Sequence, residues 1–108
     1  MINIENIPPV LRKKGIEKKL QKICEENNVV FLAIFGSYVR GEQKKRSDVD
    51  ILIKLTENSG KTLLDIVDIE YKLKRAFGKK IDLVEMEALN KHIKNEVLNS
   101  VRSVYAKR

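Results

Sequence analysis

The hydrophobic positions of the chain change their spacing several times, and each spacing predicts a different element. From Ile16 they recur at i, i+4, i+7 and i+8, the pattern of one face of an amphipathic helix, which ends at Asn27. The run from Val29 to Phe35 is then continuously apolar and rich in β-branched and aromatic residues, so it predicts a strand buried on both faces. Upstream, Pro8-Pro9 followed by Val10-Leu11 is expected to open a short helical turn, which Gly15 interrupts. The predicted buried face of the first helix consists of Ile16, Leu20, Ile23 and Cys24.

Residues 48–55 alternate between two faces and predict a second strand. Successive side chains of a strand point to opposite faces, so the apolar set fixes the register of this strand against the core. The carboxylates of Asp48 and Asp50 must then point together to the other face. The apolar set consists of Val49, Ile51 and Ile53.

The second half of the chain predicts two further helices and two further strands. Thr62 and Asp65 have the spacing of a capping box, and the helix that they open ends at Gly78. A short strand follows over residues 81–85, then a last helix over 88–100 and an edge strand over 101–106, in which Val101, Ser103 and Tyr105 share a face. The expected buried residues of the two helices are Leu63, Ile66, Val67, Ile69, Leu73, Ala76 and Phe77, and Leu89, Ile93, Val97 and Leu98.

The size and composition fit one α+β domain, a mixed α/β fold over residues 1–108. A chain of 108 residues with 43% hydrophobic residues can bury a single core of modest stability. The net charge of +7 favours a polyanionic partner: a nucleoside triphosphate, a nucleic acid or an acidic protein face. No basic stretch carries interleaved aromatic residues, however, so nucleic acid is not the expected partner.

Cysteine and histidine are too scarce for several kinds of site. Cys24 is the only cysteine, so no internal disulfide and no cysteine metal site can form, which suits a cytoplasmic protein. His92 is the only histidine, which argues against a histidine metal cluster and against a catalytic triad. No signal-like segment and no apolar run of membrane-spanning length is present, so no membrane partner is expected.

Gly36 and Ser37 stand where the first strand should end and a short helical segment should begin. Such a turn directs free backbone N–H groups at one spot, which suits a phosphate. Gly36 lets the backbone approach the phosphate, the Ser37 hydroxyl adds a donor, and Arg40 follows one helical turn later. Gly-Ser alone also fits an ordinary turn with a serine N-cap.

Two carboxylates on one strand face repel each other unless a cation lies between them. Asp48 and Asp50 are such a pair, and their hard oxygen ligands favour Mg²⁺, with Mn²⁺ as the alternative. Asp82 interrupts the apolar third strand, and if that strand neighbours the second, three carboxylates converge near the Gly-Ser turn. This arrangement predicts nucleotidyl or phosphoryl transfer assisted by two metal ions, with Asp82 accepting the proton of the attacking hydroxyl. Acidic residues on an exposed edge strand are the structural alternative.

Together the two halves resemble a known signature. Gly36-Ser37, ten residues and then Asp48-Val49-Asp50 is similar to the motif of the DNA polymerase β-like nucleotidyltransferase superfamily, and the residues around it look like those of the minimal nucleotidyltransferases. The resemblance runs from about Val29 to Val84. It implies a mixed sheet with helices packed on one face, with Gly36 and Ser37 gripping the triphosphate and all three aspartates ligating the metals.

The resemblance also implies a partner and a reaction. Many minimal nucleotidyltransferases are antitoxins paired with a small helical HEPN toxin, and they transfer AMP from ATP to a tyrosine of that toxin. A hetero-oligomer with such a toxin is therefore expected. Three alternatives stay open: an antitoxin that neutralises its partner by docking with an idle site, a nucleotidyltransferase acting on a small molecule or RNA, and a nucleic-acid-binding protein that uses the Lys-rich surface.

Overall fold

The four strands form one mixed sheet in the order β3-β2-β1-β4. The computed structural model describes residues 1–44 and 46–107. β1 lies between β2 and β4 and is antiparallel to both, whereas β3 lies parallel to β2. A parallel neighbour requires a crossover, and the helix between β2 and β3 supplies it. The strands are β1 (Val29–Phe35), β2 (Val49–Leu55), β3 (Ile81–Glu85) and β4 (Arg102–Ala106).

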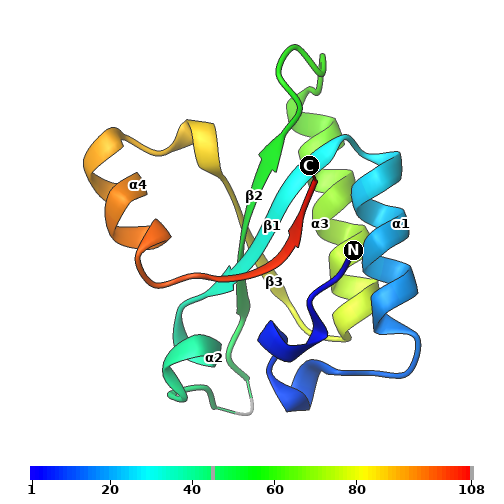
Figure 1. Ribbon diagram of the computed structural model, residues 1–108, viewed down its shortest axis with the longest axis vertical. Coiled ribbons are helices and arrows are strands. Elements are labelled where there is room, and N and C mark those ends of the chain that lie inside the picture. The colour runs from blue at the N-terminus through cyan, green and yellow to red at the C-terminus, as the bar shows by residue number, and fades with distance from the viewer. Residues whose placement is uncertain (45, 108) are drawn as a thin grey trace.

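Two long helices, α1 (Ile16–Glu26) and α3 (Leu63–Phe77), pack side by side on one face of the sheet (Figure 1). α4 (Lys91–Leu98) stands on the other side of the sheet, and the short α2 (Ser37–Arg40) lies at one end, directly after β1 (Figure 1). The predicted mixed fold, with helices packed against one face, is confirmed. No helix in the described part of the chain is both long and apolar enough to cross a membrane.

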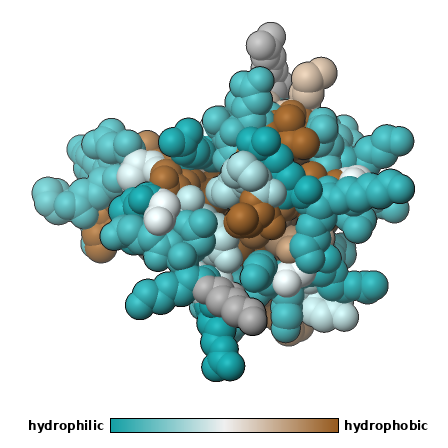
Figure 2. Space-filling model, turned by 90° about the horizontal axis from the view of Figure 1, so that it is seen from below, coloured by the Kyte–Doolittle hydropathy of each residue, from teal (hydrophilic) through white to brown (hydrophobic). Residues whose placement is uncertain are grey.

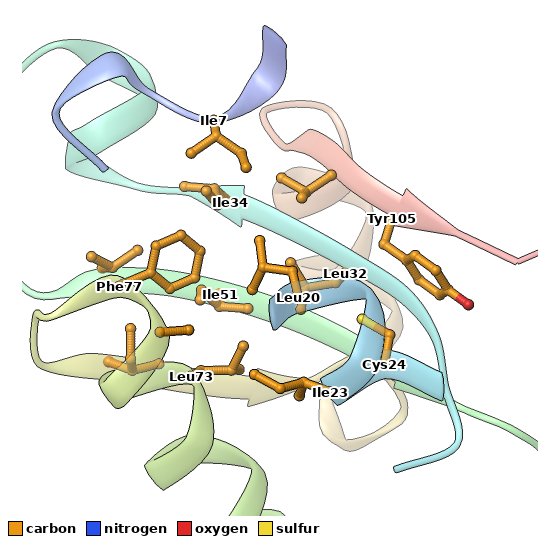
Figure 3. Close-up of a cluster of buried hydrophobic side chains, with 14 of the residues drawn as sticks. Ile7, Leu20, Ile23, Cys24, Leu32, Ile34, Ile51, Leu73, Phe77 and Tyr105 are labelled. Atoms are coloured by element: carbon orange, nitrogen blue, oxygen red, sulfur yellow. The ribbon is translucent and has the colours of Figure 1, made fainter. Parts of the chain in front are cut away.

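The core lies between the sheet and the α1–α3 pair (Figure 3). Leu20 of α1 and Leu73 and Phe77 of α3 are fully buried against strand residues such as Ile34 and Ile51. The predicted alternation of β2 is confirmed, because its apolar set is fully buried in this cluster.

β1 is less completely buried than its continuous apolar run predicts. Leu32, Ala33 and Ile34 have 0% exposure, whereas Phe31 and Phe35 are only half-buried. These two rings lie on the face of the sheet opposite α1 and α3, where the covering is thinner. The expectation of a strand buried on both faces therefore holds for one face and only in part for the other.

The helix ends follow the local signals in the sequence. Gly15 takes the left-handed conformation (φ 78°) directly before α1, and a 3₁₀ turn lies at Pro9–Leu11. The capping box of α3 forms as predicted: the Asp65 N–H donates to the Thr62 hydroxyl, and the Asp65 carboxylate accepts from the Thr62 N–H at 2.8 Å. Gly78 ends α3 in the left-handed conformation.

The predicted inward face of α3 is too wide. Ile69 and the residues after it on that face are buried, but Leu63 is 79% exposed and Val67 is 53% exposed. At about 100° per residue, Val67 lies about 160° and Leu63 about 120° around the helix from Ile69, outside the face that meets the sheet.

The last helix and the last strand also differ from their predictions. α4 is shorter than expected and buries none of its residues; Ile93 is 44% exposed and Leu98 37% exposed. In β4 the strict alternation is broken, because the pairing register with β1 shifts and both Val104 and Tyr105 are buried. Such a bulge places two consecutive residues opposite one partner, which a period of two cannot predict.

Candidate active site

The Gly-Ser turn forms where the sequence places it. Gly36 is buried and takes φ 75° and ψ −148° at the end of β1, and α2 begins at Ser37. The N–H groups of Val39 and Arg40 both donate to the Gly36 carbonyl at 3.1 Å, which closes the first turn of α2. The preceding N–H groups of this turn have no position in the helical hydrogen-bond ladder and are available to a ligand.

The Asp50 carboxylate lies directly against Gly36. A Cβ atom placed on Gly36 would stand 2.0 Å from Oδ2 of Asp50 and 2.9 Å from its Cγ. Both the space and the positive φ therefore require glycine at this position. The contact also shows that the two halves of the predicted motif meet in the folded chain.

Asp82 is the cross-strand neighbour of Asp50. In the parallel β2–β3 pair the two residues are register partners, so they share the sheet face opposite α1 and α3. The prediction that the third strand would neighbour the second is thus confirmed. Asp50 is half-buried and Asp82 is exposed, so the pair has one sheltered and one solvent-facing carboxylate.

The pKa of Asp50 is raised above its ordinary value of 3.8. Burial is the main cause, followed by the negative charge of Asp82, a hydrogen bond between the two carboxyl groups, and the charge of Asp48, while Arg40 acts in the opposite direction. Two carboxylates this close repel each other, so the site holds negative charge that a nearby cation would stabilise.

Asp48 lies near this pair but not within β2, which begins at Val49. Among residues 1–44 and 46–107, no three His, Cys, Asp or Glu side chains are arranged as a group that could hold a metal ion. The structure thus shows Asp50 and Asp82 as register partners, with the charge of Asp48 acting on Asp50. The three aspartates do not form such a group in the described chain, and metal binding by Asp48, Asp50 and Asp82 stays a prediction.

The donor set still fits a hard divalent cation. In enzymes that act on phosphates, Mg²⁺ is usually bound by one or two carboxylates together with substrate phosphate oxygens, not by a complete protein cage. Asp50 and Asp82 offer two such carboxylates beside the phosphate-suited turn, and the raised pKa of Asp50 is the electrostatic cost that a cation would relieve.

Arg40 is less available to a nucleotide than the sequence implied. It is exposed and forms an ion pair with Glu42 through its Nε atom. The positive charge of Arg40 still acts on Asp50, where it opposes the causes that raise the pKa of that carboxyl. An exposed ion pair contributes only about 0–1 kcal/mol, so a phosphate could replace Glu42 as the partner of Arg40 at little cost.

Tyr38 is a structural component of the site that the sequence analysis did not single out. Its ring is buried, and its hydroxyl donates to the carbonyl of Ser47 at 3.4 Å. The Ser47 hydroxyl in turn accepts from the N–H of Lys44 at 2.7 Å. Tyr38 therefore links α2 to the residue that precedes Asp48. The available signal was an aromatic residue directly after the Gly36-Ser37 pair.

The end of the molecule that carries α2 is mostly hydrophilic at its surface, with hydrophobic residues in small separate areas (Figure 2). A polar, open end suits a charged ligand such as a triphosphate better than an apolar one.

The comparison with protein families decides the identity of the fold. The family model described as polymerase beta, nucleotidyltransferase matches residues 18–108. The chain belongs to the polymerase β nucleotidyltransferase family. It is thus an enzyme of the nucleotidyltransferase class, and the resemblance seen in the sequence is confirmed.

Relatives with similar sequences carry a more specific name. The protein adenylyltransferase MntA of Thermococcus cleftensis is 37% identical over 101 residues, which cover 94% of this chain and 95% of that protein. A protein of Methanocaldococcus jannaschii that is named for the same activity is 38% identical over 89 residues, covering 82% of this chain and 94% of the relative.

Solved structures share the fold. A chain described as a minimal nucleotidyltransferase has a TM-score of 0.68 at 29% identity, covering 79% of this chain and 85% of that one. A toxin-antitoxin structure with AMP-PNP has a TM-score of 0.69 at 22% identity, covering 85% and 74%. A complex of a tri-AMPylated Shewanella oneidensis HEPN toxin with its MNT antitoxin has a TM-score of 0.62 at 19% identity, covering 85% and 71%. Because the last two structures are only 22% and 19% identical to this chain in sequence, they show a shared fold alone.

Proposed function

We propose that this enzyme is the antitoxin of a toxin-antitoxin pair and that it transfers AMP from Mg²⁺-bound ATP to a tyrosine hydroxyl of a HEPN-type toxin. The sequence relatives support the reaction type, because the T. cleftensis protein is named a protein adenylyltransferase. The partner class and the nucleotide follow the related complexes, one of which holds an AMPylated HEPN toxin and another AMP-PNP.

The observation that carries this proposal is the contact between the turn and the carboxylate pair. Gly36 and Asp50 approach so closely that no Cβ fits between them, and Asp82 is the register partner of Asp50. A triphosphate bound at the Gly36–Ser37 turn would therefore place its α-phosphate region beside two carboxylates. This proximity suits transfer from a nucleoside triphosphate, because such catalysis depends mainly on positioning and charge stabilisation.

Each residue has a distinct part in the proposed reaction. Gly36 and Ser37 hold triphosphate oxygens through backbone N–H groups and the serine hydroxyl, and Arg40 adds positive charge once it leaves Glu42. Asp50 and Asp82 would hold Mg²⁺, with Asp48 adding negative charge nearby. When bound, Mg²⁺ supplies charge neutralisation of the phosphates and a lower pKa of the acceptor hydroxyl.

The bonds and protons of the transfer balance without a further reactant. The acceptor oxygen forms a bond to the α-phosphorus, the bond from this phosphorus to the bridging oxygen breaks, and pyrophosphate leaves. The hydroxyl proton passes to the carboxylate of Asp82, which is exposed and can reach an acceptor on another protein. We place the reaction in the cytoplasm, where ATP is available and an unpaired cysteine such as Cys24 stays reduced.

The test uses a HEPN-type toxin as the acceptor and ATP labelled at the α-phosphate. The label should pass to the partner in the presence of Mg²⁺, and Asp50→Asn or Asp82→Asn should reduce the rate by at least ~100-fold. Asp68→Asn is the matched control, because Asp68 is an exposed aspartate of α3 on the opposite side of the sheet.

The outcomes separate the proposal from its alternatives. Equal labelling by the Asp50 variant and the control would contradict the assigned site. Neutralisation of the toxin without any label transfer would instead support docking with an idle site. Label transfer to RNA or to a small molecule, with the protein unlabelled, would replace the proposed acceptor.

A further inference from the structure

A groove lies between α1 and α3. These two helices pack side by side on one face of the sheet (Figure 1), opposite the face of the carboxylate pair. Its volume is about 400 Å³, and a nearly buried apolar floor is formed by Ile23 and Ala76. Four cations from the two helices line it, with Glu26 as the only acidic residue among the lining residues described. These cations are Lys19, Lys22, Lys72 and Arg75.

A second hollow of about 450 Å³ adjoins the first and shares Arg75 with it. It adds Lys74, Lys79 and Lys80 beside the exposed ring of Tyr71. We call the seven lysine and arginine residues of the two hollows the basic track.

The basic track concentrates positive side chains in two adjoining hollows. It contains seven of the 22 lysine and arginine residues, accompanied by Glu26 and by Asp68, which is paired with Lys72 at 2.9 Å. Among the described residues that line the two hollows, seven are basic and Glu26 alone is acidic. A field of one sign over a groove attracts a polyanion.

An aromatic ring lies within the basic track, although the linear sequence shows no aromatic residue interleaved with a basic run. Tyr71 is 57% exposed, and the Arg75 guanidinium lies 6.0 Å from the centroid of its ring. One turn of α3 brings the two together. Proteins that bind single-stranded nucleic acid combine basic grooves with exposed rings on which bases stack.

The groove floor distinguishes a nucleic acid from an acidic protein. Protein interfaces are anchored by large side chains that enter apolar pockets. Ile23 is only 9% exposed and Ala76 only 4%, so neither residue opens a deep apolar pocket for such an anchor. Phosphates need only the cations along the rim, and a base needs only a ring face.

From these observations we propose that the α1–α3 face binds single-stranded nucleic acid, with phosphates on the basic track and a base stacked on Tyr71. This binding goes beyond the proposed transfer reaction and uses the opposite side of the sheet (Figure 1). A nucleic acid and the acceptor protein could thus be bound at the same time.

The experiment measures fluorescence anisotropy of labelled 12-nucleotide RNA and DNA strands with the full chain at several salt concentrations. With about four phosphate contacts, the slope of log affinity against log salt should be about −2.8 for a single strand. Lys22→Glu combined with Arg75→Glu should weaken binding at least ~10-fold and reduce the slope by about 1.4. Tyr71→Ala should weaken binding at least ~5-fold and leave the slope unchanged.

The matched control is Lys91→Glu combined with Lys107→Glu, an equal charge change at two exposed lysines outside the basic track. Equal weakening by both pairs, or binding that ignores salt, would overturn the proposal. So would unchanged RNA and DNA binding by the basic-track pair together with lost binding of the HEPN-type partner, which would assign the face to a protein. The preference between the two strands identifies RNA or DNA as the ligand.

Two control measurements distinguish a loss of nucleic-acid binding from a folding defect and from a loss of the transfer reaction. Thermal unfolding should show the basic-track variants to be folded, and they should still transfer AMP at the normal rate. If transfer fails in every variant and in the wild type while strand binding behaves as described, only the proposed function is lost.

Discussion

Gly36→Ala tests the central claim about the site, namely that the turn and Asp50 are built against each other. The substitution adds one methyl group at φ 75° and ψ −148°, close to a backbone region that only glycine populates freely. The new Cβ would meet Oδ2 of Asp50 at 2.0 Å, whereas real Cβ contacts essentially never fall below 3.0 Å. The carboxylate must therefore move by at least 1.0 Å or the turn must deform.

Two magnitudes follow from this geometry. The backbone strain alone should lower the free energy of unfolding by about 1–3 kcal/mol. A displacement of about 1 Å at a catalytic group can cost ~100-fold in rate, so AMP transfer should fall by at least that factor. The domain should still fold, because the side chain of Asp50 faces away from the core beneath α1 and α3.

The assay combines urea unfolding with initial rates of AMP transfer to the partner. Gly15→Ala is the backbone control: Gly15 has φ 78°, but an added methyl group would have no atom within 4 Å, so this variant should lose about 1–2 kcal/mol of stability and keep its activity. In an Asp50→Ala background, Gly36→Ala should cost less stability than in the wild type, because the two atoms that would lie within 3.0 Å, Oδ2 and Cγ of Asp50, are gone. A folded Gly36→Ala protein with activity within threefold of the wild type, or an unchanged loss of stability in the Asp50→Ala background, would show that the turn and Asp50 do not constrain each other.

Three further predictions follow from the described contacts. Asp50→Asn should raise the free energy of unfolding at neutral pH in the absence of metal. The pKa of Asp50 is raised in the fold, so wild-type stability falls as the pH rises from about 3.8 through the folded pKa. Urea titrations across this range should show a flatter curve of stability against pH for the variant than for the wild type. Tyr38→Phe should lower stability by less than about 1 kcal/mol, because the bond to Ser47 is long at 3.4 Å, but should lower the transfer rate severalfold by freeing the segment before Asp48; an unchanged rate would exclude this link. Thr62→Ala removes the N-cap of α3 and should lower the free energy of unfolding by about 1 kcal/mol, seen in thermal unfolding as a midpoint about 4–8 °C lower. Thr62→Ser keeps a hydroxyl at this position and should retain most of the wild-type stability.

The parts of the fold that sequence could predict are those set by local rules. Strand parity placed Asp50 opposite the apolar face of β2, because side chains alternate whatever surrounds the strand. The capping box at Thr62 and the glycine at position 78 follow from backbone hydrogen bonding within one turn. The neighbourhood of Asp50 and Asp82 required one assumption, that β3 would pair with β2, and the crossover through α3 satisfies it.

The parts that sequence could not predict depend on what lies next to an element in space. Helical spacing identifies the apolar face of a helix but not how much of that face its neighbours cover. Val67 was therefore predicted to point inward although it is exposed. The bulge at Val104 arises from pairing with β1, which the β4 sequence does not encode alone. Arg40 was expected to face a phosphate, but Glu42 lies close enough to pair with it first.

The positions of the two paired carboxylates imply a direction for the proposed reaction. Asp50 is half-buried in β2 against the Gly36 turn, whereas Asp82 is exposed on β3, which forms one edge of the sheet. A triphosphate held by the turn would thus lie over the β1–β2 end, on the sheltered side of the pair. The open edge beside Asp82 leaves room for a large acceptor such as another protein. The raised pKa of Asp50 belongs to the same arrangement, because a carboxylate placed for a cation is destabilised until the cation arrives.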